Sequence, residues 1–313
     1  MRVLFWGTPD FAAPAFRALI GEGFDVVGAV TQPDKPQGRN RDVTAPPVKA
    51  IALEERIPVF QPSTPKDADF VQTLLGMQPD ISIVVAYGHI LPRPIIDMPR
   101  FGTLNIHASL LPLLRGAAPI QAAIREGHSM SGVSIMRMVP ALDAGPVILQ
   151  ANVPILDDET YGELQLRLSE LGALTLMEAL ALMSLGESRE TAQDDSLATY
   201  APKVTREQAR IDWSLSAIEV SRTVRAFDPK PGAFTTRDGT DVKMFGARLL
   251  PDSPSENETT APGTAVSVTD GLVIACRDGL IRISDVQPSG KSRMTSAQWA
   301  RGRGVTPGDI FGT

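Results

Sequence analysis

The chain of 313 residues has one cysteine, three histidines and few aromatic side chains. With Cys276 alone it can form neither an internal disulfide nor a cysteine-rich zinc site, and we expect Cys276 to be a small buried apolar residue. His89, His107 and His128 have no metal-ligand spacing, and the sequence contains no HExxH motif. We therefore expect no metal site and a reducing environment.

Long apolar runs are also missing. No run approaches the roughly 18 apolar residues that a membrane helix needs. Residues 3–6 are apolar, but Gly7 and Pro9 follow too soon for the core of a signal peptide, so this run predicts a first strand. We expect a cytoplasmic protein without a membrane partner.

Three well-known ligand-binding and catalytic motifs are absent. The first strand is followed by Gly7-Thr8-Pro9 instead of GxGxxG, which disfavours a dinucleotide cofactor. There is no GxxxxGK[ST], so a nucleotide triphosphatase of the P-loop type is disfavoured. A GxSxG nucleophile elbow is missing as well.

Short apolar strands alternate with helices through the first 186 residues. Strands that are apolar on both faces and separated by helices indicate a parallel sheet covered on both sides. The sequence therefore predicts a doubly wound, mostly parallel, Rossmann-like α/β domain over residues 1–186. The strands are expected at 2–7, 25–32, 59–62, 80–88, 103–112, 130–138 and 146–156, and a polar loop at 33–47.

The pattern changes after this domain. Residues 187–205 are polar with weak periodicity and predict a linker. In residues 206–313, a helix at 214–227 is followed by short strands, and Asp270-Gly271 and Asp278-Gly279 stand between alternating runs as hairpin turns. A β-rich domain of this size suggests a small barrel, and an OB-like fold is the leading candidate.

Charge is distributed unevenly between the two parts. Residues 206–313 have a net charge of +1, whereas the first 205 residues have −7. The C-terminal part ends in a run of basic residues, which is either solvated surface or a contact for an anionic partner. These residues are Arg277, Arg282, Lys291, Arg293, Arg301 and Arg303.

Two polar segments are candidates for chemistry. Asn105 and His107 are two apart at the end of a predicted strand, so both side chains point to one face, where they could stabilise an oxyanion. Asp143 precedes a Gly-Pro turn and could orient the imidazole from the same edge of the sheet. A buried structural histidine and a turn-capping aspartate would give the same patterns.

The same segments resemble the signatures of the 10-formyltetrahydrofolate-dependent formyltransferases. The first signature is NIHASLLP with RGAAPI, residues 105–112 and 115–120, and the second is LDAGP, residues 142–146. Further similar segments extend the resemblance over the whole chain: residues 7–11, 31–39, 47–49, 86–92, 199–203, 211–213 and 287–291. The resemblance is strongest to members that formylate the methionine of initiator Met-tRNA for translation initiation.

The resemblance implies a one-carbon transferase with 10-formyltetrahydrofolate as the formyl donor and no metal. Asn105 and His107 would stabilise the oxyanion, and Asp143 would hold His107 and help move the proton. The residues expected to bind the folate are Ser109, Leu110, Leu111, Pro112, Tyr87, Gly88, Ile90, Leu91 and Leu142. Those expected to bind tRNA are Lys35, Arg39, Arg41, Lys203, Lys291 and Arg293. We expect a monomer.

The sequence departs from the family pattern at several positions. Leu113 and Leu114 stand where a basic and an aromatic residue are usual, residues 40–42 are less basic, and Lys230 replaces a tryptophan. None of these changes removes a catalytic group, but the first two bear on tRNA affinity. Three alternatives remain: a formyltransferase acting on a small amine such as a nucleotide sugar, a tRNA-binding protein without catalysis, and a Rossmann oxidoreductase.

Overall fold

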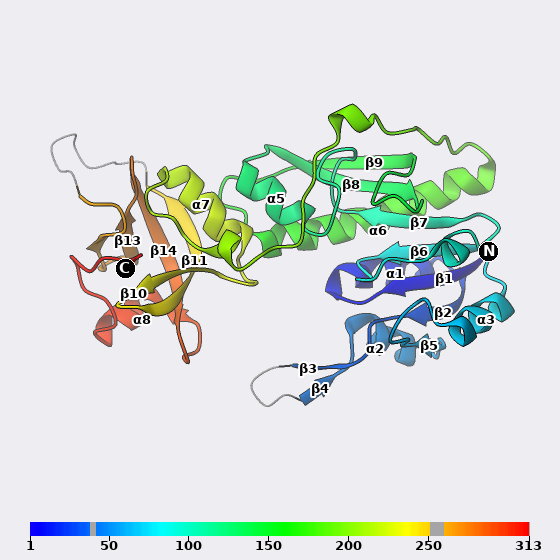
Figure 1. The fold of residues 1–313 in the computed structure, drawn as a ribbon, viewed down its shortest axis with the longest axis horizontal. Helices are drawn as coiled ribbons and strands as arrows, with labels where there is room; N and C mark the ends of the chain where they lie inside the picture. The colour runs from blue at the N-terminus through cyan, green and yellow to red at the C-terminus, as the bar shows by residue number, and fades with distance from the viewer. Residues whose placement is uncertain (38–41, 251–259, 313) are drawn as a thin grey trace. The chain divides into compact units, whose positions relative to one another are not determined.

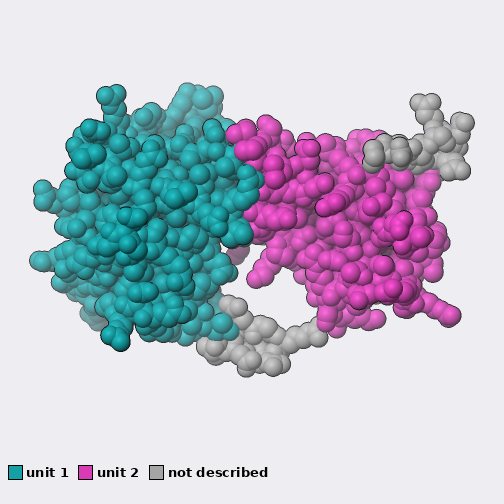
Figure 2. All heavy atoms as spheres, turned by 180° about the vertical axis from the view of Figure 1, so that it is seen from behind, with its two compact units in different colours: residues 1–119, 131–153, 165–201 teal, residues 120–130, 154–164, 202–313 magenta. Residues whose placement is uncertain are grey.

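The computed structural model describes residues 1–37, 42–250 and 260–312, which form two compact units. Unit 1 comprises residues 1–119, 131–153 and 165–201, and unit 2 comprises residues 120–130, 154–164 and 202–312 (Figure 2). The chain thus passes between the units more than once. The domain limits at residues 186 and 205 stay predictions.

Unit 1 contains a seven-stranded sheet in the order β5-β2-β1-β6-β7-β8-β9 (Figure 1). β5, β2, β1, β6 and β7 run parallel, and β8 is antiparallel to β7. This confirms the predicted mostly parallel sheet. The strands are β1 (Arg2–Gly7), β2 (Asp25–Val30), β5 (Val59–Phe60), β6 (Ile81–Val85), β7 (Thr103–His107), β8 (Met130–Arg137) and β9 (Val147–Pro154).

The helices of the first 186 residues follow the predicted alternation with the strands. They are α1 (Ala13–Gly21), α2 (Pro47–Glu54), α3 (Ala68–Met77), α4 (Arg93–Ile96), α5 (Pro119–Glu126) and α6 (Tyr161–Leu185), with a 3-10 turn at Asp10–Ala12. β1 is buried on both faces, as a central parallel strand must be, and the ring of Phe5 stacks on that of Phe16 from α1. After β1 the chain adds β2 and β5 on one side of this strand, and it then adds β6 and β7 on the other side. The strand order therefore reverses between β1 and β6, and the carboxyl ends of these two strands form the switch point where such sheets bind ligands.

Among the described residues one helix, α6, is long and apolar enough to cross a membrane by length and composition. Its mean hydropathy over the most apolar window is 1.4, and 44% of that window is buried. A Cβ added at Gly172 would lie 2.9 Å from Cγ2 of Ile106 in β7, so the glycine lets α6 approach the sheet. This close packing is the arrangement of a core helix.

Two segments differ from the sequence-based expectation. The segment 33–47 was expected to be a loop, but it contains the paired strands β3 (Lys35–Gln37) and β4 (Asp42–Thr44). The strand expected at 103–112 ends at His107, because the chain turns back there to bond with itself. β10 (Ala233–Arg237) is the first of the short strands that follow the helix expected at 214–227.

Unit 2 is built around an antiparallel sheet with the order β10-β11-β14-β13-β12 and β15 paired to β14. Asp270-Gly271 and Asp278-Gly279 form the turns around β13, as predicted, and the curled sheet confirms the OB-like class. The remaining elements are β11 (Thr240–Leu249), β12 (Ala265–Ser267), β13 (Leu272–Ala275), β14 (Leu280–Pro288), β15 (Met294–Thr295), α7 (Ala217–Ala226) and α8 (Ser296–Arg301), with a 3-10 turn at Glu207–Ala209.

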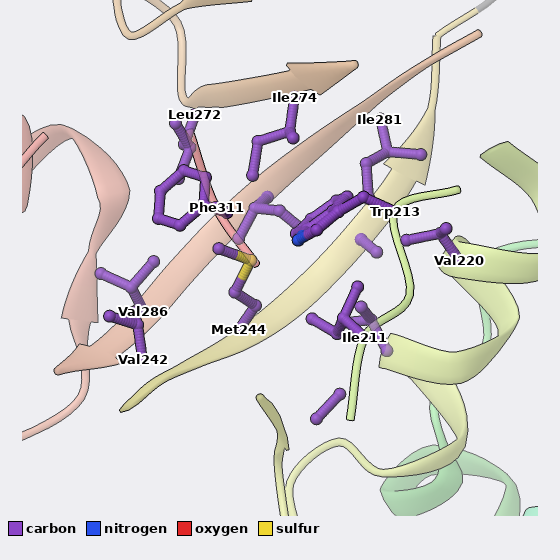
Figure 3. Close-up of a cluster of buried hydrophobic side chains, with 14 of the residues drawn as sticks. Ile211, Trp213, Val220, Val242, Met244, Leu272, Ile274, Ile281, Val286 and Phe311 are labelled. Atoms are coloured by element: carbon purple, nitrogen blue, oxygen red, sulfur yellow. The ribbon is translucent and has the colours of Figure 1, made fainter. Parts of the chain in front are cut away.

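The core of unit 2 lies between this sheet and α7. Trp213, Met244 and Ile281 point into it in Figure 3, and each is at most 4% exposed. The indole Nε1 of Trp213 donates a hydrogen bond of 2.9 Å to Thr235 Oγ1, so its one polar atom is satisfied. Cys276 belongs to the same core, as predicted, and burial together with Asp278 raises the pKa of its thiol to about 12.

Candidate functional site

The candidate site begins where β7 ends. Asn105 pairs in register with Val84 of β6 and Met136 of β8, and His107 lies opposite Ser134. Because strand residues two apart share a face, both side chains point to one side of the sheet, as predicted. Asn105 is half-buried and His107 is 5% exposed, so an amide and an imidazole are largely shielded from water at this edge.

The ring of His107 has two different neighbours. Its Nε2 lies 3.0 Å from the carbonyl oxygen of Leu114, which can only accept, so Nε2 must carry a hydrogen. Its Nδ1 lies 3.7 Å from Asp143 Oδ2. The backbone therefore fixes one ring nitrogen, and the nitrogen left for chemistry is Nδ1, beside the carboxylate.

Asp143 links two loops. Its Oδ2 accepts a hydrogen bond of 2.8 Å from the backbone N–H of Gly116, in addition to facing His107. Its φ of 47° is in the left-handed region, which costs energy for any residue but glycine and is best tolerated by Asn and Asp. The turn at 143 and the loop after β7 are therefore joined by the carboxylate that the sequence singled out.

Polar side chains of the neighbouring strands hold the loop after β7. Ser134 Oγ donates to Ser109 O at 2.7 Å and accepts from Leu111 N at 3.1 Å. Gln150 Nε2 donates to Ser134 Oγ and to Leu111 O. Ser109 Oγ donates to Leu113 O at 2.6 Å. Ser109, which was expected to bind folate, thus uses its hydroxyl within the loop.

The other expected folate residues differ widely in exposure. Leu110 and Pro112 are half-buried, and Leu111 is 5% exposed. Ile90 is 78% exposed and Leu142 58%, so both present apolar surface.

Tyr87 and Leu91 belong instead to a buried apolar cluster with Trp6 at the ends of β1 and β6. Burial raises the pKa of Tyr87 to about 12. Tyr87 Oη and Trp6 Nε1 are buried without a hydrogen-bond partner among the described residues. Gly88 has a φ of 92°, a value that favours glycine and lets the chain turn after Tyr87.

A second polar network ties the ends of β1, β2 and β5 together. Lys49 Nζ donates to Asp34 Oδ2 at 2.6 Å and to Gln61 Oε1 at 2.8 Å. Gln61 Nε2 donates to Asp34 Oδ1 and to Gln32 O, and Gln32 reaches Thr8 and the carbonyl of Tyr87. The start of the segment that carries β3 and β4 is therefore fixed to the switch point.

The expected tRNA-binding residues are placed as follows. Lys35, Lys203 and Lys291 are exposed. Arg293 is ion-paired to Asp228 at 3.1 Å and Asp285 at 2.9 Å, and its guanidinium lies 4.1 Å from the centre of the Phe245 ring. The predictions for Arg39 and Arg41 lie outside the described residues.

Sequence reasoning missed the polar residues that position the site, among them Gln150 and Gln193. Their partners are mainly backbone atoms far along the chain, and no local pattern marks such bonds. Arg115 was visible only as part of the family signature. Within the described residues no cluster of three or more His, Cys, Asp or Glu side chains could hold a metal ion.

The fold and the site define an α/β protein with an amide, an imidazole and a carboxylate at the carboxyl edge of its sheet, followed by an OB-like unit. This class is suited to transfer of an acyl-type group through a charged oxygen. The chain belongs to the formyl transferase family: residues 1–180 match the family model "Formyl transferase", and residues 203–304 match "Formyl transferase, C-terminal domain".

Individual relatives agree with this assignment. The methionyl-tRNA formyltransferase of Methylococcus capsulatus is 45% identical over 296 residues, covering 95% of both chains. The sugar 3N-formyl transferase WlaRD, solved in the presence of dTDP and 5-N-formyl-THF, has a TM-score of 0.68 at 16% identity, with 93% of this chain and 99% of that chain covered. HypX from Aquifex aeolicus with tetrahydrofolic acid has a TM-score of 0.65 at 22% identity over 95% of this chain, which spans about half of HypX (46%). The two structures show the shared fold.

Proposed function

We propose that the protein transfers the formyl group of 10-formyltetrahydrofolate to the amino group of methionine on initiator Met-tRNA, for translation initiation. The observation that carries this proposal is the 45% identity to a methionyl-tRNA formyltransferase over 95% of both chains, which includes the C-terminal unit. The retained Asn105, His107 and Asp143 support an active enzyme over a binding protein. Such a reaction belongs in the cytoplasm, and we propose that the protein acts there as a monomer.

In the proposed reaction the methionine nitrogen attacks the formyl carbon, and the bond from that carbon to the folate nitrogen breaks. Negative charge develops on the formyl oxygen, where hydrogen bonds from the Asn105 amide and His107 Nδ1 would stabilise it. Because His107 Nε2 already donates to Leu114 O, donation from Nδ1 requires the doubly protonated ring.

Asp143 has two proposed tasks in this scheme. Its carboxylate, 3.7 Å from Nδ1, keeps the imidazole oriented. Through a water molecule, it would also relay the proton from the attacking amine to the departing folate nitrogen. No nucleophile of the enzyme is needed, since the formyl carbon itself carries the reaction.

The surroundings of the site fit a folate as the donor. Ile90 and Leu142 offer exposed apolar surface for flat rings, and the turning backbone at Gly88 offers a donor and an acceptor for a pterin edge. For tRNA we propose phosphate contacts from Lys35, Arg39, Arg41, Lys203 and Lys291. Arg293, which the sequence also predicted to bind tRNA, is left out of this set because two carboxylates already neutralise it.

The direct test incubates the full chain with labelled 10-formyltetrahydrofolate and either charged initiator tRNA or an amino sugar linked to a nucleotide. We expect formyl-methionine on the tRNA and no label on the sugar. The Asn105→Ala variant and deacylated tRNA serve as negative controls. Label only on the sugar would replace the proposal by the small-amine alternative, and binding of tRNA without transfer of label would replace it by a non-catalytic protein.

A further inference from the structure

The last part of unit 1, residues 191–201, is bonded to both loops that carry the proposed catalytic groups, although its sequence predicts a linker. Thr191 exchanges two backbone hydrogen bonds of 2.8 Å with Val147, just after the turn that holds Asp143. Thr199 accepts hydrogen bonds of 2.9 Å from Arg115 N through its carbonyl and from Leu114 N through its hydroxyl. This segment is therefore part of the site's scaffold.

Gln193 is the side chain of this segment that reaches the Asp143 turn. Its Nε2 donates to the carbonyl oxygen of Asp143 at 2.8 Å and to that of Gly145 at 2.7 Å. Both hydrogens of the amide are thus used on the two sides of one turn. Two hydrogen bonds to carbonyls of the same turn restrict the backbone of that turn more than a single hydrogen bond would.

Arg115 determines which way the Gln193 amide points. Its Nε and NH2 donate to Gln193 Oε1 at 3.1 and 2.8 Å, and the arginine is 3% exposed. Since a guanidinium can only donate, the atom facing it must be the amide oxygen, and the amide nitrogen must face the turn. The second partner of Arg115, Asp195, has a side chain that is 79% exposed.

The turn needs such support because its geometry is unfavourable. Asp143 has a φ of 47°, and the backbone is so close at Gly145 that an added Cβ would lie 1.8 Å from Arg137 O. In this conformation the Asp143 carboxylate accepts a hydrogen bond from Gly116 N and lies beside His107 Nδ1. A small rotation at residue 143 would displace the carboxylate from both.

We propose that Gln193, oriented by Arg115, is a positioning residue that holds the Asp143 turn in its catalytic conformation. The proposal deepens the proposed function, on which it rests for the role of Asp143. The proposal gives a role in catalysis to the segment that lies between the two regions matched by the family models.

The decisive variant is Gln193→Glu. Glutamate keeps the size and the oxygen that Arg115 binds, but it removes both donors and sets a negative charge against two carbonyl oxygens. We expect kcat to fall about 10- to 100-fold, the cost of a misplacement of about 1 Å, with KM for both substrates and Tm close to wild type. Gln72→Glu, the same substitution at an exposed glutamine of α3, is the matched control, and it should change none of these values.

Two further measurements separate positioning from a general structural role. In an Asp143→Ala background, Gln193→Glu should cause little further loss of kcat, because the group it positions is gone. Exchange of the Gly116 amide, which Asp143 protects, should speed up in Gln193→Glu, while the Arg115 and Ala118 amides, which bond the carbonyls of Thr199 and Ala201, stay protected. Full additivity of the two substitutions, or an unchanged kcat in Gln193→Glu, would overturn the proposal.

Failure of the proposed function has a different signature. If the wild-type chain transfers no formyl group to Met-tRNA, the proposed function is wrong. If Asp143→Ala has a normal kcat, the role proposed for Asp143 is wrong. The exchange of the Gly116 amide still reports whether Gln193 holds the turn, since that measurement needs no activity. An unchanged Gly116 amide in Gln193→Glu then refutes the positioning itself.

Discussion

The edge of the sheet in unit 1 and the β-rich unit 2 use their polar groups in opposite ways. At the edge, His107, Asp143 and Gln193 are bonded to backbone atoms of neighbouring loops, so each side chain has a set direction. In unit 2 the core around Trp213 is mainly apolar, and charges such as Arg293 pair with carboxylates. The first arrangement suits chemistry, which depends on orientation. The second suits a stable unit that would bind an anionic partner through those surface charges that are not paired with carboxylates.

The largest effect should come from the core of unit 2. Trp213→Ala removes a large side chain that is 4% exposed and leaves Thr235 Oγ1 without its donor. We expect a loss of about 3 to 5 kcal/mol in the free energy of unfolding, measured by denaturant titration. Tyr200→Ala, at an aromatic side chain that is 62% exposed, is the control and should lose far less. Equal losses for the two would contradict the packing described for this core.

The second prediction concerns the site itself. Asn105→Ala and His107→Ala should each lower kcat about 100-fold, the effect of losing one oxyanion donor and equivalent to about 2.7 kcal/mol, with little change in Tm. His128→Ala is the matched control, because His128 lies 3.4 Å from Glu126, outside the site, and should keep normal turnover. Steady-state kinetics with charged tRNA give the answer. Normal turnover in a folded His107→Ala protein would remove that residue from the mechanism.

These two regions also differ in how far their sequences predict them. The alternation of apolar strands with helices predicted the sheet, and the two-residue spacing predicted that Asn105 and His107 share a face. Local spacing, however, could not predict that Leu114 O would bind Nε2 and leave Nδ1 for Asp143, since that depends on how the loop turns back after β7.

Long-range hydrogen bonds from side chains to the backbone could not be predicted from the sequence for the same reason. Gln193 lies 50 residues from Asp143, and Gln150 lies 39 residues from Leu111. Polar residues in a segment of weak periodicity look like a linker when their partners are carbonyls elsewhere in the chain. β3 and β4 escaped prediction because strands of three residues give almost no alternation.

The third prediction tests the charges of unit 2. Lys291→Glu and Lys203→Glu should weaken tRNA binding, and each should lower the slope of log affinity against log salt by about 1 per lost phosphate contact. Lys66→Glu, which makes the same charge change at an exposed position of unit 1, is the control. Affinity measured across salt concentrations for the three variants gives the slopes. Three slopes equal to wild type would exclude both lysines as phosphate ligands.

Arg293 sharpens this test. Arg293→Gln leaves Asp228, whose side chain is 7% exposed, without its ion-pair partner. We therefore expect a lower Tm for this variant with an unchanged salt slope. A lower slope at wild-type Tm would show instead that Arg293 leaves its carboxylates to bind phosphate.

The smallest effect is expected at the network that fixes the start of the β3–β4 segment. The hydrogen bond from Lys49, followed by that from Gln61, holds the pKa of Asp34 below its usual value. A lowered carboxyl pKa adds stability above the unfolded pKa of about 4, and this stability is lost as the pH falls through the folded pKa. Lys49→Met should therefore lower Tm slightly at pH 7, and the difference from wild type should shrink below about pH 4.

The control for this measurement is Arg17→Met. Arg17 and Glu54 form an exposed ion pair of 3.8 Å, so its loss should change Tm little at any pH. A Tm difference for Lys49→Met that stays constant from pH 7 to pH 3 would mean that Lys49 stabilises by packing and not through the Asp34 carboxylate. Gln61 also donates a hydrogen bond to Gln32 O, and Gln32 donates to Thr8 and to Tyr87 O at the switch point. Loss of the Asp34 contact should therefore speed up hydrogen exchange of the backbone amide of Gln32, which donates to Thr8.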